Sequence, residues 1–144
     1  MGRFCAICEK HRGAGELVGP VIFADDLVVV THQPLGKGSS PGYLFVETRR
    51  HAVTVADLTE AEAAAVGWAV TRAARALRQE LAPEAVFSMV TGRSVAHFHQ
   101  HVFARPPGTP DAVPWHDTTS WPERPRLDEA GLIDLVRGLR RRFA

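Results

Sequence analysis

The chain of 144 residues has only two cysteines, almost no net charge and no long hydrophobic run. Its 17 Lys and Arg residues nearly balance 16 Asp and Glu residues, so no bulk charge attracts nucleic acid or an anionic membrane. No apolar run approaches the length that crosses a bilayer, and the sequence from Met1 to Cys5 lacks an apolar leader. We therefore expect a cytoplasmic protein that binds neither nucleic acid nor membranes.

The two cysteines, Cys5 and Cys8, have the spacing Cys-x-x-Cys. In a reducing compartment, cysteines serve metal or redox chemistry more often than a structural disulfide. A short turn with this spacing can present two thiolates to one tetrahedral zinc. A thioredoxin-like redox pair is the alternative, but that motif normally follows a strand, and none precedes Cys5. Metal binding is favoured, and His51 and one histidine of residues 97–101 are candidates for the remaining ligands.

Three of the seven histidines occupy alternate positions, at His97, His99 and His101. Side chains alternate between the two faces of an extended strand, so these three imidazoles would project from one face. A structural need for three adjacent imidazoles is hard to find. The spacing therefore indicates a reactive surface.

The remaining pattern fits one α+β domain. Alternating and β-branched residues predict strands within residues 20–31, 42–48, 85–90 and 95–104, with a turn at 91–94. Apolar residues at helical spacing predict a long helix from about residue 57, capped by Asp57 or Thr59 and ended by Pro83. Residues 32–40 are rich in Gly, Ser and Pro, and we expect this loop to face the substrate.

The composition changes after Arg105, because residues 106–125 contain six prolines together with Trp115 and Trp121. Proline lowers the entropy cost of ordering such a segment, and the tryptophans supply apolar area, which favours an ordered wrap. A disordered linker is the alternative. A second helix is predicted over residues 128–142, and we expect residues 106–144 to belong to the same domain as residues 1–105.

Residues 97–103, His-Phe-His-Gln-His-Val-Phe, resemble the His-x-His-x-His motif of the histidine triad (HIT) superfamily of nucleotidyl hydrolases and transferases. Residues 22–26 resemble the family's first strand pair, residues 41–46 with Arg50 and His51 its strand before the helix, and residues 92–95 its phosphate turn. The resemblance covers roughly residues 5–105. It implies a HIT-like fold with an antiparallel sheet of about five strands, a long helix and a C-terminal helix, and it implies a homodimer.

The resemblance also implies a zinc ligand set. In zinc-bearing members the metal is held by an N-terminal Cys-x-x-Cys, a histidine before the first helix and the first histidine of the triad. These residues correspond to Cys5, Cys8, His51 and His97. Four protein ligands leave no open position for water, so this zinc would be structural. Residues 1–105 would then form a HIT domain with an N-terminal zinc arm.

The family's nucleophile corresponds to His99. A neutral imidazole can attack an α-phosphate to give a covalent nucleotidyl-histidine, which water or another acceptor then releases. His101 would bond to the phosphate or assist the leaving group. In the phosphate turn, Gly92 would allow a close backbone approach and Ser94 would supply a hydroxyl.

Four further residues are expected to bind substrate. Phe23 lies in the first strand pair, and Gln33 stands where many adenosine-preferring members carry an acidic residue that binds the ribose. Arg93 replaces the usual glutamine of the phosphate turn, where it would bind a second phosphate or a carboxylate, or point to solvent. Arg105 resembles a basic residue of diadenosine polyphosphate hydrolases. The nucleoside preference stays open because Gln33 lacks the charge of a carboxylate.

These residues predict a hydrolase that acts on the α-phosphate of a nucleoside phosphoramidate, a dinucleoside polyphosphate or a similar nucleotide ester. One alternative is a nucleotidyltransferase or phosphorylase that uses phosphate or a sugar phosphate as the acceptor. A second alternative is a zinc-stabilised nucleotide-binding module without catalytic activity, because family membership does not guarantee turnover.

Overall fold

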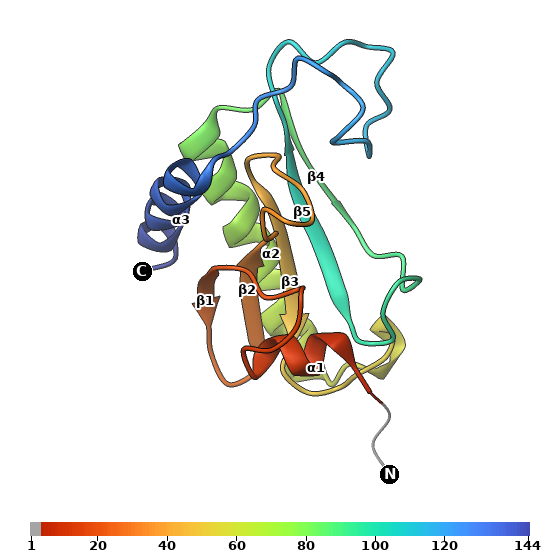
Figure 1. Cartoon of the computed structure of the whole chain (residues 1–144). Coiled ribbons are helices and arrows are strands. Elements are labelled where there is room, and N and C mark those ends of the chain that lie inside the picture. Colours follow the sequence, from red (N-terminus) through yellow and green to blue (C-terminus); the bar gives the residue numbers. More distant parts are fainter. Residues whose placement is uncertain (1–3) are drawn as a thin grey trace.

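One antiparallel sheet of five strands organises the computed structural model, which describes residues 4–144 (Figure 1). The spatial order is β1-β2-β3-β5-β4, and each neighbouring pair is antiparallel. The strands are β1 (Val21–Ala24), β2 (Val28–His32), β3 (Tyr43–Thr48), β4 (Ala85–Met89) and β5 (His99–Arg105). The predicted α+β class and its antiparallel sheet are confirmed. Residues 1–3, at the start of the segment expected to lack a leader, lie outside the described residues.

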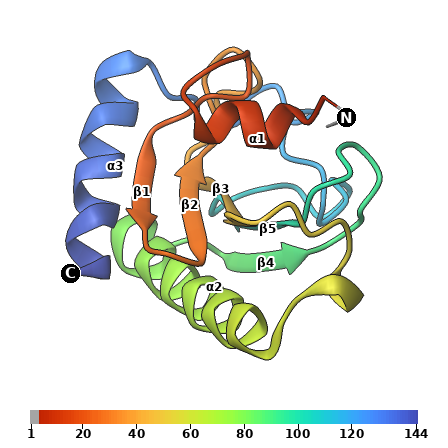
Figure 2. The same cartoon turned by 90° about the horizontal axis from the view of Figure 1, so that it is seen from below.

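Helices lie on both faces of this sheet. They are α1 (Ala6–His11), α2 (Glu60–Leu81) and α3 (Glu129–Phe143), with a short 3-10 turn, η1 (Val55–Asp57), before α2. Figure 2 shows α2 on one face of the sheet, α1 on the other, and α3 beside β1. None of the helices in residues 4–144 combines the length and apolar character needed to span a membrane.

The long helix α2 begins and ends as its sequence predicts. The hydroxyl of Thr59 accepts a hydrogen bond from the Glu62 N–H at 3.0 Å, and the Glu62 carboxylate accepts one from the Thr59 N–H at 2.9 Å. This reciprocal capping box satisfies two amides that the helix itself leaves unpaired. Ala82 then adopts a left-handed conformation with φ of 44°, directly before Pro83.

The hydrophobic core lies between the sheet and the helices α2 and α3. It combines β-branched residues of the strands with small residues of α2, which allow close packing. Its fully buried members include Val28, Val30, Leu44, Val46, Ala73, Leu77, Val102 and Leu139.

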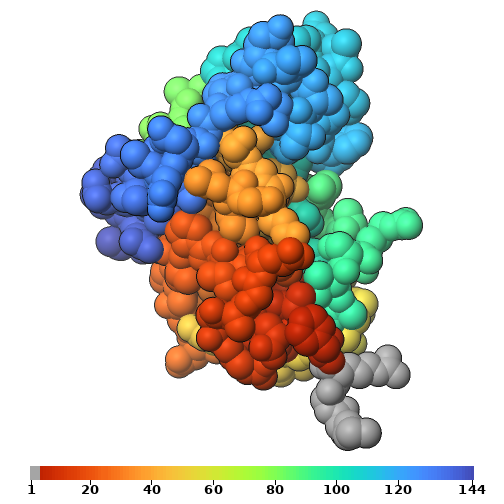
Figure 3. Space-filling view, in the orientation of Figure 1, coloured from red at the N-terminus to blue at the C-terminus, as the bar shows by residue number. Residues whose placement is uncertain are grey.

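The proline-rich segment after β5 is an ordered wrap over one end of the sheet (Figures 1 and 3). The ring of Trp115 packs against Phe103 and Phe87, with centroid distances of 6.2 and 5.4 Å. The Ser40 hydroxyl donates to the Thr118 carbonyl oxygen at 2.7 Å. These contacts join the segment to β4, to β5 and to the loop before β3.

The strand that carries the histidines is shorter than predicted. We expected it to include residues 95–104, but β5 begins at His99. The N–H of Phe98 donates to the Ala52 carbonyl oxygen at 2.6 Å, so the chain before His99 pairs with the segment that follows β3. The prediction that all three imidazoles share one strand face is therefore wrong, because His97 lies outside the strand.

Candidate functional site

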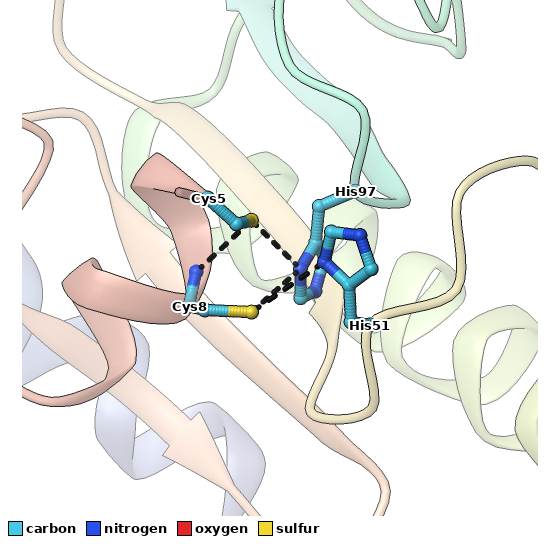
Figure 4. Close-up of side chains that lie close together, drawn as sticks. All are labelled: Cys5, Cys8, His51 and His97. Atoms are coloured by element: carbon cyan, nitrogen blue, oxygen red, sulfur yellow. Dashed lines mark hydrogen bonds between the residues drawn. The ribbon is translucent and has the colours of Figure 1, made fainter. Parts of the chain in front are cut away.

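Two cysteines and two histidines from distant parts of the chain converge beside α1 (Figure 4). Cys5 caps the N-terminus of α1, Cys8 lies within it, His51 follows β3, and His97 precedes β5. One potential ligand atom from each residue lies within 4.8 Å of the others. Three sulfur to Nδ1 distances, Cys5 to His97, Cys8 to His51 and Cys8 to His97, are each 3.5 Å.

This donor set fits a tetrahedral metal ion. Bond lengths of about 2.3 Å to sulfur and about 2.0 Å to nitrogen give a sulfur to nitrogen edge of roughly 3.5 Å in a tetrahedral zinc site. The Nε2 atom of His97 donates to the Thr48 carbonyl oxygen at 2.7 Å, which leaves Nδ1 unprotonated toward the sulfurs. Burial and the neighbouring Cys5 raise the pKa of the Cys8 thiol, and a bound cation would hold it as a thiolate.

His99 is held in one tautomer by the backbone. Its Nδ1 lies 2.7 Å from the carbonyl oxygen of His97, and a carbonyl can only accept, so Nδ1 carries the proton. The Nε2 atom is then unprotonated, and it lies 3.4 Å from the hydroxyl of Ser94. An imidazole nitrogen with a free lone pair beside a hydroxyl has the character of a nucleophile.

His101 is held by Tyr43, which lies on the neighbouring strand β3. The tyrosine oxygen is 2.7 Å from Nδ1 of His101 and has no other hydrogen-bond partner among residues 4–144. Burial raises the pKa of Tyr43 to about 12, so its hydroxyl is neutral and able to donate to Nδ1 of His101. Burial, together with the nearby His99, lowers the pKa of His101 to about 4. At neutral pH His101 is therefore an uncharged ring whose Nε2–H remains free to donate.

A cavity of about 290 Å³ opens in front of these side chains. Ser94, His99 and His101 line it together with Gln33, so four of the residues expected at the substrate site share one cavity. The other lining residues are Ile7, Lys10, Leu17, Pro34, Lys37, Phe45, Glu47 and Val95. Its volume is at the low end of the range for small-molecule sites.

A second cavity, of about 240 Å³, shares His99 with the first. Gly92 lies in its lining with φ of 66°, a conformation that favours glycine, and His97 contributes as well. The remaining lining residues are mostly apolar: Val53, Thr54, Val55, Val90, Thr91 and Phe98. His99 therefore lines both cavities.

The loop that presents Gln33 is fixed by His32. The buried ring of His32 accepts a hydrogen bond from the Gly42 N–H at 3.0 Å and donates to the Gln33 carbonyl oxygen at 2.8 Å. The Gln33 amide lies against Gly38, where a Cβ atom would come within 2.5 Å of the Gln33 side-chain oxygen. We expected residues 32–40 to face the substrate, and Gln33, Pro34 and Lys37 of this loop line the larger cavity.

Two residues expected to bind substrate lie elsewhere. Phe23 packs against Trp68 and Phe143, with centroid distances of 5.1 and 5.3 Å, because a bulge between Val21 and Phe23 interrupts the alternation of β1. Arg105 is at the far end of β5, about 20 Å along the strand from His99.

Arg105 serves the wrap instead of the cavity. It forms an ion pair with Glu84 at 2.9 Å and donates to backbone carbonyls of the wrap at Pro110, Val113 and Pro114. Arg93 is exposed and, among the described residues, it lines neither of the two cavities beside His99.

Three residues at the site were missed by sequence reasoning. The position of Tyr43 depends on the strand register, which the sequence does not show. Phe45 pairs with His101 and Tyr43 with Phe103, and this register sets the Tyr43 hydroxyl beside the triad. Lys10 and Glu47 line the larger cavity as an ion pair with a 2.8 Å contact. One signal was available, since Glu47 is a carboxylate in an otherwise apolar strand, where burial requires a partner.

Several solved structures share the fold of this chain. A histidine triad nucleotide-binding protein from Sulfolobus tokodaii superposes with a TM-score of 0.72 at 15% identity, over 96% of this chain and 91% of that one. A Zn-bound histidine triad family protein from Mycobacterium smegmatis has a TM-score of 0.67 at 21% identity, over the same shares of the two chains. A member of the HIT family from Bacillus subtilis has a TM-score of 0.63 at 19% identity, over 99% of each chain.

No curated protein matches the sequence. The family model described as HIT domain matches residues 14–108. The match includes His51 and the three histidines of the triad, and the fold has the expected sheet and helices. The chain therefore belongs to the HIT domain family.

Proposed function

We propose that the protein is a nucleotidyl hydrolase that acts on the α-phosphate of a nucleoside phosphoramidate, a dinucleoside polyphosphate or a similar nucleotide ester. The observation that carries the proposal is the hydrogen bond from His99 Nδ1 to the His97 carbonyl oxygen, which leaves Nε2 free toward the cavity. The family contains nucleotide-binding proteins, and the Sulfolobus relative carries that description.

In the first step, Nε2 of His99 attacks the α-phosphorus while the bond to the leaving group breaks. The product is a nucleotidyl-histidine with a nitrogen to phosphorus bond, and the leaving group takes a proton from solvent, either directly or through the Ser94 hydroxyl, which regains its own proton from solvent. In the second step, water attacks the phosphorus and releases a nucleoside monophosphate. His99 recovers its neutral form because the water proton passes to solvent.

His101 acts as a neutral donor in this scheme. With Nδ1 bound to the Tyr43 hydroxyl, its Nε2–H can bond to a non-bridging phosphate oxygen in both steps. Its low pKa argues against a role as a charged general acid at neutral pH. The backbone at Gly92 and the hydroxyl of Ser94 supply further contacts to the phosphate.

Cys5, Cys8, His51 and His97 would hold a zinc ion in a structural role, because four ligands leave no position for substrate. The Zn-bound relative from Mycobacterium smegmatis supports the choice of metal. Such an ion would tie α1 to the segment that ends in His99.

The larger cavity, which includes Gln33, would take the nucleoside, and the cavity beside Gly92 would take the leaving group. The test is a product assay in water enriched in heavy oxygen, with adenosine, guanosine and uridine phosphoramidates and dinucleoside polyphosphates. The proposal predicts nucleoside monophosphate that carries the isotope on phosphorus. Exclusive transfer to added phosphate, which yields a nucleoside diphosphate, would instead identify a phosphorylase, and absence of turnover with every compound would contradict both activities.

A further inference from the structure

The ion pair of Lys10 and Glu47 lies in the wall of the catalytic cavity, where the mechanism above gives it no role. The ammonium of Lys10 is 2.8 Å from Oε2 of Glu47, and the two side chains are only 5% and 2% exposed. Both residues line the cavity that contains His99 and His101. Because desolvation of two charges offsets most of their attraction, stability alone does not account for a buried pair at this position.

The strand register places this pair directly beside the catalytic histidines. Glu47 on β3 is the partner of His99 on β5, and Phe45 is the partner of His101. The ammonium of Lys10 lies 5.0 Å from the centroid of the Phe45 ring, which is itself 5.2 Å from the centroid of His101. A ligand that reaches His99 in this cavity therefore meets Lys10 and Glu47 within the length of a nucleoside.

After the hydrogen bonds of the pair are formed, Lys10 still has one N–H that can donate, and the carboxylate of Glu47 can still accept further bonds. Lys10 donates to Glu47 and to the Thr31 hydroxyl, each at 2.8 Å, and an ammonium has a third proton. Glu47 bonds to Lys10 through one oxygen and to His11 Nε2 through the other at 3.0 Å, and each carboxylate oxygen can accept more than one bond. Burial would raise the pKa of Glu47, but the bonds from His11 and Lys10 outweigh it and keep the carboxylate ionised.

The pair is suited to a neutral ligand and not to a second anion. The charges of Lys10 and Glu47 cancel, and an anion placed against Lys10 would also meet the carboxylate. The Lys10 ammonium can only donate and the Glu47 carboxylate can only accept, and the two lie side by side. A ligand edge that is complementary to them has a hydrogen-bond acceptor next to a donor. Ile7, Leu17, Pro34 and Val95 give the cavity an apolar surface that suits the faces of a flat ring. The other cation of the lining, Lys37, forms an ion pair with Glu16 at 2.8 Å.

We propose that Lys10 and Glu47 determine base specificity by binding the edge of a base in which a carbonyl oxygen adjoins a ring N–H, as in guanine and uracil. The Lys10 ammonium donates to the carbonyl oxygen, and the Glu47 carboxylate accepts from the ring N–H. Adenine also presents an acceptor next to a donor, through N1 and its amino group, but the amino group is a weaker donor to the carboxylate than a ring N–H beside a carbonyl. This inference rests on the proposed function, because it assigns the base of the same nucleotide.

The first experiment uses the wild-type protein and compares the binding of uridine monophosphate with that of its N3-methyl derivative by calorimetry. The methyl group replaces the ring N–H and leaves the rest of the nucleotide unchanged. Loss of a hydrogen bond to a charged group lowers affinity by about ten- to a hundredfold. Equal affinities, or tighter binding of the methylated nucleotide, would overturn the proposal without any variant that risks misfolding.

The second experiment measures kcat/KM for the four nucleoside phosphoramidates on the wild type, Lys10→Met and Glu47→Gln, with melting temperature and zinc content as checks on the fold. We expect the wild type to prefer guanosine and uridine over adenosine by about tenfold or more, and both variants to lose that preference. The control Arg12→Met removes a cation from the exposed side of α1, where Arg12 pairs with Glu9, and should keep the preference.

An equal fall of kcat/KM for all four bases in Lys10→Met, or a wild-type preference for adenosine, would overturn the base assignment while the hydrolase assignment stands. Failure of every nucleotide to bind or react would overturn both proposals. The two failures are therefore distinguishable.

Discussion

The carbonyl oxygen of His97 accepts a hydrogen bond from Nδ1 of His99 at 2.7 Å, while the ring of the same His97 faces the sulfurs of Cys5 and Cys8. One residue therefore belongs to the candidate metal cluster through its side chain and to the proposed catalytic arrangement through its backbone. A change in the cluster that moves His97 would also change the tautomer and the direction of His99. Under the proposed function, a metal bound by this cluster would therefore affect catalysis without contacting the substrate.

Substitution Cys5→Ser tests the ligand set. We expect zinc content and stability to fall together, with a loss of more than about 3 kcal/mol in the free energy of unfolding, because metal binding contributes to folding. Metal analysis and chemical unfolding measure the two quantities. His99→Ala is the matched control, since it removes an imidazole outside the cluster and should retain the metal. A Cys5→Ser protein that still holds zinc at the wild-type level would refute the ligand set.

Substitution Tyr43→Phe tests the assignment of His101 as an oriented neutral donor. Removal of the hydroxyl frees the ring of His101 to rotate and to change tautomer, so we expect kcat to fall by about tenfold or more. The aromatic contacts of Tyr43 with Phe45 and Phe103 are kept by phenylalanine, so stability should change little. Steady-state kinetics with a single phosphoramidate measures the effect. An unchanged kcat would show that Tyr43 does not position His101.

The hydrophobic pattern and the local signals predicted most of the fold. The capping box of Thr59 and the stop at Pro83 define α2 because both signals act within one turn of helix. The helix α1 was not predicted, since six residues are too few for a periodicity and Cys5 is an unusual cap. The start of β5 at His99 was also missed. It depends on the bond from Phe98 to Ala52, a contact between segments far apart in the chain.

The dependence of stability on pH tests the burial of His101. Its pKa of about 4 in the folded protein lies below the ordinary value of 6.5, so the unfolded chain binds more protons between these two values. The contribution of His101 to stability is therefore complete above pH 6.5 and is lost as the pH falls toward 4. The lowered pKa of the buried His32 acts in the same direction.

The measurement is the free energy of unfolding of the wild type and of His101→Gln from pH 7 to pH 4. Metal loss at acid pH affects both proteins, so the difference between them isolates His101. We expect the stability advantage of the wild type over the variant to shrink as the pH falls. A difference that stays constant across this window would contradict the low pKa.

Substitution Gly42→Ala tests the turn before β3. Gly42 has φ of 80°, and a Cβ atom there would come within 2.6 Å of Leu81 and 2.9 Å of Leu77. Backbone strain and overpacking together should cost more than about 2 kcal/mol. At Gly36 a Cβ atom meets nothing within 4 Å, so Gly36→Ala should be nearly neutral. Thermal or chemical unfolding of the two variants decides the point, and equal stabilities would contradict the packing described around Gly42.

Sequence motifs predicted the part of the site that they contain. They did not predict the contacts that depend on tertiary packing. The Cys-x-x-Cys spacing predicted a metal site, and the family resemblance predicted the full cluster of Cys5, Cys8, His51 and His97, which the structure brings together. Phe23 was assigned to the substrate by its place in a strand pair, but a bulge and the aromatic rings of α2 and α3 determine its contacts. Arg105 was assigned by its resemblance to a basic residue of diadenosine polyphosphate hydrolases, which does not reveal the wrap that its guanidinium binds.

The central claim is that Nε2 of His99 forms a covalent bond to the phosphorus of a nucleotide. The most direct test is intact-protein mass spectrometry, within seconds of mixing, of the wild type and His99→Ala with nucleoside phosphoramidates, dinucleoside polyphosphates and nucleotide sugars. The account predicts a mass increase of one nucleotidyl group on the wild type and none on the variant. Turnover of any of these compounds with no adduct on the wild type, or an adduct that persists in His99→Ala, would contradict it.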